Sequence, residues 1–298
     1  MPRLLNIAAV QAEPHRVGTP LSQFADDVAR VTSSESGIQL VVYPELHLFG
    51  TEHETANRRN ELLSDSAVSL DHPMVHELGM IARNAGVWLI PGSVCERGPA
   101  GQLFNTALAF SPTGALVASY RKIFPWRPYE PYEPGDKFVV FDIDDIGRFG
   151  LSICYDSWFP EVTRHLAWMG AEAVLNIVKT TTPDRAQELV LARANSITNQ
   201  TFTVSVNSAG PIGKGRSLVV DPEGAVLAET GDDHPAILHQ IIDLDEVRRV
   251  RADGTAGVNR MWSQFLPSDA SISLPLYGGS IDPGRWQPHS PTSTHPTE

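Results

Sequence analysis

Three side chains with catalytic potential each follow an apolar segment of the sequence: Glu45 follows LVVYP, Lys122 follows LVASYR and Cys154 follows RFGLSI. A free thiol has a pKa of about 8.5 and is mostly protonated at neutral pH, but a neighbouring base or cation makes it an effective nucleophile. Glu45 could accept the thiol proton, and Lys122 could stabilise an oxyanion. If the three segments converge, the residues suit acyl transfer through a thioester, which needs no metal.

Taken one at a time, the same residues have ordinary structural interpretations. A single cysteine at a strand end is usually a small buried hydrophobe. A glutamate after a proline is most often a loop carboxylate, and a single lysine is most often solvated. The separation of Lys122 and Cys154 along the chain does not decide between these interpretations.

Hydrophobic periodicity predicts the elements that would carry these residues. The pattern of strand, helix and strand over the first forty residues indicates a βαβ unit, whereas Pro112-Thr113-Gly114 and Asp221-Pro222-Glu223-Gly224 indicate hairpins. We expect strands at 4–10, 38–43, 87–94, 103–111, 115–121, 137–143, 148–154, 173–178, 201–207, 217–220, 225–229 and 235–242, and helices at 20–34, 73–85, 161–170 and 184–200. This mixture of crossovers and hairpins predicts an α/β protein with two stacked mixed sheets and outer helices.

Composition excludes several classes of protein. The 298 residues include 23 basic and 35 acidic side chains, and the net charge of −12 argues against nucleic acid as a partner. There is no apolar run long enough to cross a membrane and no secretory leader pattern, and two cysteines are too few for a disulfide scaffold. These features predict a soluble cytoplasmic protein with reduced thiols and no membrane partner.

A metal site receives little support from the sequence. His72 and His76 are four residues apart, a spacing that could bind a metal from one helix face. Pro73 between them, with Asp71 as a candidate N-cap, favours the start of a helix instead. We therefore predict no metal and no cofactor.

The motifs around the three residues resemble those of the nitrilase superfamily of carbon–nitrogen hydrolases, in its amidase-type branch. The similar segments are Y-P-E at Glu45, Y-R-K at Lys122, I-C-Y-D-x-x-F-P-E at Cys154, A-R-A-N-x-x-x-N-Q ending at Gln200, and G-x-S-x-V-V-D-P-x-G ending at Gly224. The resemblance implies a four-layer α-β-β-α sandwich, with Glu45 as general base, Lys122 as oxyanion stabiliser and Cys154 as nucleophile. It also implies a homodimer or higher homo-oligomer.

The resemblance further implies a second assisting glutamate between the lysine and the cysteine. Glu130 and Glu133 are both available. The pattern K-x-x-P-W-x-P-x-E-x-x-x-P-G, typical of aliphatic amidases and formamidases, aligns Glu130 with that role. Glu133 is the alternative.

The predicted reaction is hydrolysis of a small carboxylic amide to a carboxylate and ammonia. Tyr155 follows the nucleophile, as in amidases and carbamoyl hydrolases, whereas nitrilases tend to have tryptophan there. The alternatives are an N-carbamoyl amino acid hydrolase, a nitrilase, or a non-catalytic binding protein of the same fold. The candidate substrate-binding residues are Trp126, Tyr155, Trp158, Lys179 and Thr180.

The C-terminal region has a different composition from the rest of the chain. Residues beyond about 280 are rich in Pro, Ser and Thr and read as an extended or disordered tail. We predict one hydrolase domain over residues 1–265, followed by an arm and flexible tail over 266–298.

Overall fold

The computed structural model describes residues 2–274 and 279–281, and the predicted flexible tail lies largely outside this range. Two sheets form its centre. The first contains, in spatial order, β13 (Ala236–Asp243), β1 (Leu4–Gln11), β2 (Leu40–Val42), β3 (Trp88–Ile90), β5 (Leu103–Phe110) and β4 (Ser93–Arg97), with β6 (Leu116–Arg121) also paired to β5. The second contains β12 (Val226–Glu229), β11 (Leu218–Val220), β10 (Phe202–Asn207), β9 (Ala173–Val178), β8 (Gly147–Ile153) and β7 (Val140–Ile143).

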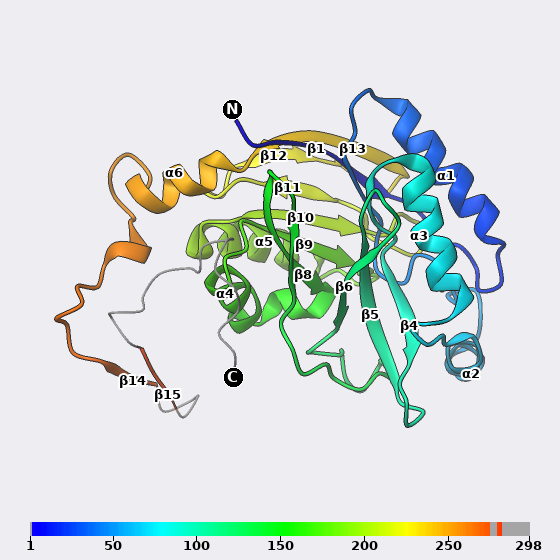
Figure 1. The fold of residues 1–298 in the computed structure, drawn as a ribbon. Helices are drawn as coiled ribbons and strands as arrows, with labels where there is room; N and C mark the ends of the chain where they lie inside the picture. Colours follow the sequence, from blue (N-terminus) through cyan, green and yellow to red (C-terminus); the bar gives the residue numbers. More distant parts are fainter. Residues whose placement is uncertain (1, 275–278, 282–298) are drawn as a thin grey trace.

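Helices cover the outer faces of the two sheets. The helices α1 (Leu21–Ser34) and α3 (Pro73–Ala85) lie at one side of the molecule, and α4 (Pro160–Trp168) and α5 (Arg185–Asn199) lie at the other, with the strands between them (Figure 1). Two further helices are α2 (Ala56–Ser66) and α6 (Asp245–Asp253), and the short strands β14 (Ile272–Leu274) and β15 (Gly279–Ile281) pair antiparallel. The predicted four-layer α-β-β-α sandwich of mixed sheets is confirmed.

Apolar residues of both sheets meet in one central core. This core includes Ile7 and Leu40 of the first sheet together with Leu151 and Leu175 of the second, all fully buried. A second core joins the outer face of the first sheet to α1 and α3. Because β9 is buried on both faces, its sequence AVLNIV is apolar at every position except Asn176 and does not alternate.

The structure differs from the sequence prediction at several boundaries. The strand expected over 87–94 is two strands, β3 and β4, because Pro91 and Gly92 interrupt it. Gly92 has a φ of 91°, and a Cβ there would collide with the Pro44 carbonyl oxygen, so only glycine fits beside the loop that carries Glu45. Helix α2 was not predicted, since its sequence ANRRNELLSDS has no apolar stripe.

The histidine pair at 72 and 76 belongs to a helix start, as expected. The N-cap is His72 rather than Asp71, and the His72 Nδ1 accepts a hydrogen bond of 3.1 Å from the Met74 N–H. Among the residues that the structure describes, no group of three His, Cys, Asp or Glu side chains could hold a metal ion. None of the described helices is long and apolar enough to cross a membrane.

Candidate active site

The predicted catalytic residues come from strand ends of both sheets. Glu45 lies in the loop after β2, Lys122 directly follows β6, and Cys154 directly follows β8. The carboxyl ends of the parallel strands β8, β9 and β10 lie at one edge of the second sheet, so the loops after them are neighbours. The two sheets therefore bring these chain segments together at one place.

Lys122 is the centre of a buried charge cluster. Its Nζ donates to Glu45 Oε1 at 3.0 Å and to Glu130 Oε1 and Oε2 at 2.8 and 3.0 Å. The lysine and Glu45 are 0% and 2% exposed, respectively. Burial opposes the charge of Lys122, but Glu45 and Glu130 outweigh burial and hold the pKa of the ammonium well above its usual range. The lysine is therefore a permanent cation in the site.

The two glutamates considered from the sequence have different surroundings. Glu130 binds Lys122 and also accepts a hydrogen bond of 2.9 Å from the Trp126 N–H. Glu133 is exposed and pairs with Arg127 at 3.5 Å. The structure thus places Glu130, and not Glu133, at the lysine.

Two further groups fix the Glu45 carboxylate. Asn105, fully buried in β5, donates to Glu45 Oε1 at 2.7 Å, and the Lys179 backbone N–H donates to Oε2 at 2.9 Å. Sequence reasoning missed Asn105. An asparagine inside the mostly apolar strand LFNTALAF could have marked this residue as unusual, but not Glu45 as its partner.

Cys154 has an unusual backbone conformation. The strand was expected to include it, but β8 ends at Ile153 and Cys154 begins the short 3-10 helix η1 (Cys154–Trp158) with a φ of 47°. Positive φ is uncommon for a residue with a Cβ, and such strained residues concentrate at functional sites. Burial and the charge of Glu45 raise the pKa of the thiol well above its usual range, against the opposing effect of Lys122.

Asp156, which the sequence analysis did not single out, holds the turn at Cys154. Its carboxylate accepts hydrogen bonds from the Tyr120 hydroxyl at 2.7 Å, from the Phe124 N–H at 2.9 Å and from the Ile153 N–H at 3.0 Å. Burial raises the pKa of Asp156 to about 6, although Lys122 and these hydrogen bonds oppose the shift. The aspartate thereby connects three segments by hydrogen bonds: β6, the loop after Lys122 and the turn at Cys154.

The predicted substrate-binding residues have varied surroundings. Thr180 Oγ1 lies 3.9 Å from Cys154 Sγ, whereas Lys179 Nζ forms an ion pair of 2.6 Å with Glu52. The ring of Tyr155 packs against Phe159, with centroids 5.3 Å apart, and is 6.1 Å from the ring of Trp158. Trp126 is exposed, and its ring contacts Tyr129.

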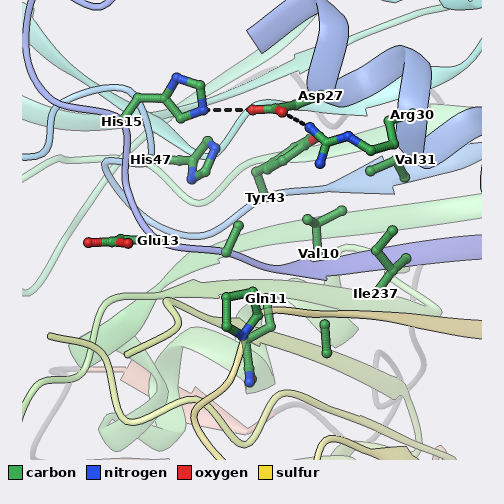
Figure 2. Close-up of a pocket in the computed structure, with 13 residues that line it drawn as sticks. Val10, Gln11, Glu13, His15, Asp27, Arg30, Val31, Tyr43, His47 and Ile237 are labelled. Carbon is green, nitrogen blue, oxygen red and sulfur yellow. Dashed lines mark hydrogen bonds and ion pairs between the residues drawn. The ribbon is translucent and has the colours of Figure 1, made fainter. Parts of the chain in front are cut away.

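A half-open cavity of about 420 Å³ lies on another side of the Glu45 loop. Its lining includes Tyr43 and His47, which flank Glu45 in sequence, but none of the four predicted catalytic residues. Figure 2 shows the rings of Tyr43 and His47 beside a chain of contacts from His15 through Asp27 to Arg30. The two rings are 4.7 Å apart and almost fully buried, so they support the loop from behind.

Comparison with known proteins relates this geometry to a family. The sequence pattern named carbon-nitrogen hydrolase matches residues 6–252. The chain is 33% identical over 229 residues to a formamidase of Pseudomonas syringae pv. syringae, covering 75% of this chain and 65% of the formamidase. It is also 33% identical over 268 residues to a 2-oxoglutaramate amidase of Paenarthrobacter nicotinovorans, covering 83% of this chain and 86% of that protein.

A solved structure agrees with these sequence matches. An amidase of the nitrilase superfamily from Nesterenkonia superposes with a TM-score of 0.70 and 27% identity, covering 84% of this chain and 95% of that one. A structure of a glutamate-to-glutamine mutant of that amidase shows the product of Michael addition of acrylamide at the active-site cysteine. The chain spans about two thirds of the length of the formamidase that it matches.

Proposed function

Because the chain belongs to the carbon–nitrogen hydrolase family, we propose that it hydrolyses a small carboxylic amide through a thioester on Cys154. The observation that carries this proposal is the buried cluster of Lys122 with Glu45 and Glu130 beside a cysteine at a strand end. Support also comes from the relatives, which are named as amidases, and from the active-site cysteine of the Nesterenkonia amidase, which acts as a nucleophile in the Michael addition of acrylamide.

The first half of the reaction forms the thioester. Glu45 takes the proton of Cys154 as the sulfur attacks the amide carbonyl carbon, and the carbonyl electron pair moves onto oxygen. Lys122, a fixed cation, stabilises that oxyanion without reorganisation. As the C–N bond breaks, the proton held by Glu45 passes to the nitrogen, and ammonia leaves.

The second half releases the acid. Glu45 removes a proton from water, the water oxygen attacks the thioester carbonyl, and collapse of the second tetrahedral intermediate returns the thiol and a carboxylate. Glu130 orients Lys122 through two hydrogen bonds throughout the cycle. The sum is R-CO-NH₂ plus water giving a carboxylate and ammonium.

The charges in the site favour an uncharged acyl group. Lys179 is the residue that could have attracted an anionic substrate, but its ammonium is neutralised by Glu52 at 2.6 Å. Burial opposes the charge of Glu52, yet Lys179 outweighs it and lowers the pKa of this carboxyl, so the pair stays ionic. The proposed substrates are therefore short uncharged amides rather than monoamides of dicarboxylic acids.

Substitution of the nucleophile tests the reaction. We expect Cys154→Ser to abolish ammonia release while the circular dichroism spectrum and melting temperature stay close to those of the wild type. The assay compares formamide, acetamide, propionamide, dicarboxylic monoamides, N-carbamoyl amino acids and simple nitriles. Retained turnover in the serine variant would remove the thioester from the mechanism, and a preference for carbamoyl compounds or nitriles would replace the amide assignment.

The proposal also covers the cellular location, the oligomeric state and the domain boundaries of the enzyme. Two free cysteines suit a reducing cytoplasm, and the resemblance to carbon–nitrogen hydrolases favours a homodimer or larger homo-oligomer. Val190 and Ile197, exposed on α5, offer apolar surface for such an assembly. Sedimentation velocity of the full chain would measure its oligomeric state. A hydrolase domain over 1–265 with an arm over 266–298 remains part of the same proposal.

A further inference from the structure

A second buried chain of polar contacts reaches Cys154 from α5. Arg185 Nη1 pairs with Glu188 Oε2 at 3.0 Å, and both side chains are almost completely buried. The Glu188 carboxylate accepts the Thr180 hydroxyl at 2.8 and 2.7 Å from its two oxygens. Thr180 Oγ1 in turn lies 3.9 Å from Cys154 Sγ. Glu188 of α5 thus connects to the sulfur atom of Cys154 through Thr180.

The direction of the hydrogen bonds in this chain follows from counting protons. A carboxylate paired with a guanidinium has no proton to donate, so Glu188 can only accept. The single hydroxyl hydrogen of Thr180 therefore points to Glu188. The threonine oxygen faces the sulfur with a lone pair, and it can only accept a hydrogen from Cys154.

The charged groups around the sulfur reinforce this arrangement. Glu45, Glu130 and Lys122 act on it from the first sheet, and Glu188, paired with Arg185, acts from α5. After burial and Glu45, the carboxylates of Glu188 and Glu130 also raise the pKa of the thiol, whereas Lys122 lowers it. The guanidinium of Arg185 also interacts with the sulfur and favours its charged form.

We propose that Glu188 is a positioning residue that acts through Thr180 to hold Cys154 as a protonated thiol until an amide binds. This inference rests on the proposed function, because it takes Cys154 as the nucleophile. When the sulfur attacks, the S–H bond breaks and its proton, until then hydrogen-bonded to Thr180, passes to Glu45, while the S–C bond forms and the carbonyl electron pair moves onto oxygen beside Lys122. The resting enzyme is consequently protected from alkylation and oxidation, which require the thiolate.

The test measures the rate at which iodoacetamide alkylates Cys154 in the full chain as a function of pH, with the adduct located by mass spectrometry. In Glu188→Gln, the loss of the nearby negative charge should lower the midpoint of the profile by about one pH unit. Alkylation at neutral pH should then be up to about tenfold faster than in the wild type. A folded Glu188→Gln protein with the wild-type midpoint would overturn the proposal.

Glu172→Gln is the matched control. Glu172 also forms a buried ion pair, with Arg3 at 2.8 Å, but it precedes β9, whereas Thr180 follows that strand. The Glu172→Gln substitution should therefore leave the midpoint of Cys154 alkylation unchanged, although it also removes a buried charge. A lowered midpoint in this control would mean that general loosening of the fold, and not Glu188, governs the thiol.

Two threonine variants keep the test decisive if Glu188→Gln does not fold. Thr180→Ser retains the hydroxyl and should keep the wild-type midpoint, whereas Thr180→Ala removes the acceptor and should lower it. Identical profiles for the two variants would overturn the proposal. Failure of the proposed function is a separate result, because it appears as ammonia release by Cys154→Ser whatever the alkylation profiles show.

Discussion

At the scale of single residues, the site depends on one lysine that is completely buried and doubly paired. An ammonium removed from water is stable only if carboxylates compensate for the lost hydration. Glu45 and Glu130 both lie within 3.0 Å of Lys122 Nζ. Removing either carboxylate should therefore change the position and the charge balance of the cation that stabilises the oxyanion.

The two neighbouring glutamates provide a direct comparison. We expect Glu130→Gln to lower kcat about 100-fold, as loss of one oriented electrostatic contact typically does. Glu133→Gln should change kcat by less than about twofold, because the Glu133 pair with Arg127 is exposed. Steady-state kinetics with the best amide substrate measures both. A larger loss in Glu133→Gln would reverse the assignment of the assisting glutamate.

At the scale of elements, the loop after β2 is held from two sides. Gly92 allows the backbone between β3 and β4 to approach Pro44, and the rings of Tyr43 and His47 pack behind the loop. Both ring nitrogens of His47 and the Tyr43 hydroxyl are buried and have no hydrogen-bond partner among the described residues. These two side chains thus support the loop by packing and not by hydrogen bonds, at the cost of buried polar atoms, whereas Glu45 itself is held by hydrogen bonds.

Burial lowers the pKa of His47 to about 3, and the nearby His15 adds to this effect. Between the unfolded pKa of about 6.5 and this value, the unfolded chain binds a proton that the folded protein does not. The free energy of unfolding should therefore fall as pH falls through this window, by an amount on the order of a few kcal/mol from His47.

Urea unfolding at pH 7 and pH 5 tests this dependence. His47→Phe keeps a ring in the core without a titrating group, so its stability should decrease less on acidification than that of the wild type. His234→Phe is the control, because His234 is highly exposed, and it should lose stability as the wild type does. Equal losses in all three proteins would contradict a role for His47.

At the scale of the whole molecule, the site requires two sheets to be held in a fixed relation. Arg3, just before β1 of the first sheet, forms ion pairs of 2.8 Å with Glu172 before β9 and with Asp245 at the start of α6. It also donates to the carbonyl oxygens of Ile146, between β7 and β8, and Leu244. The Arg3 side chain thereby links the start of β1 in the first sheet to the segments that precede β8 and β9 in the second sheet.

Arg3→Ala should destabilise the protein by about 3 kcal/mol, because it leaves the buried Glu172 without its cation. Arg58→Ala, which removes an exposed pair with Glu61, should cost less than about 1 kcal/mol. Chemical denaturation of both variants measures the difference. Equal midpoints would show that Arg3 does not carry the connection between the sheets.

The local sequence predicted most elements because the residues on the buried face of a helix or strand are apolar and recur at a regular spacing. Strands such as β9 and helices such as α1 and α3 occur within two or three residues of the expected ranges. The polar helix α2 and the break at Gly92 were missed, since one lacks an apolar stripe and the other depends on the distant Pro44. Periodicity reports which face is buried, but not what lies against it.

The sequence by itself determined most of the elements and, through motif resemblance, the family and the candidates Glu45, Lys122, Glu130 and Cys154. Only the tertiary structure showed that Asn105 orients Glu45, that Asp156 fixes the nucleophile turn, and that Glu188 contacts Thr180. It also showed that Glu52 neutralises Lys179. Asn105 and Glu45 are 60 positions apart, and Glu52 and Lys179 are 127 apart. Such contacts leave no local pattern, because their partners are chosen by the packing of the two sheets.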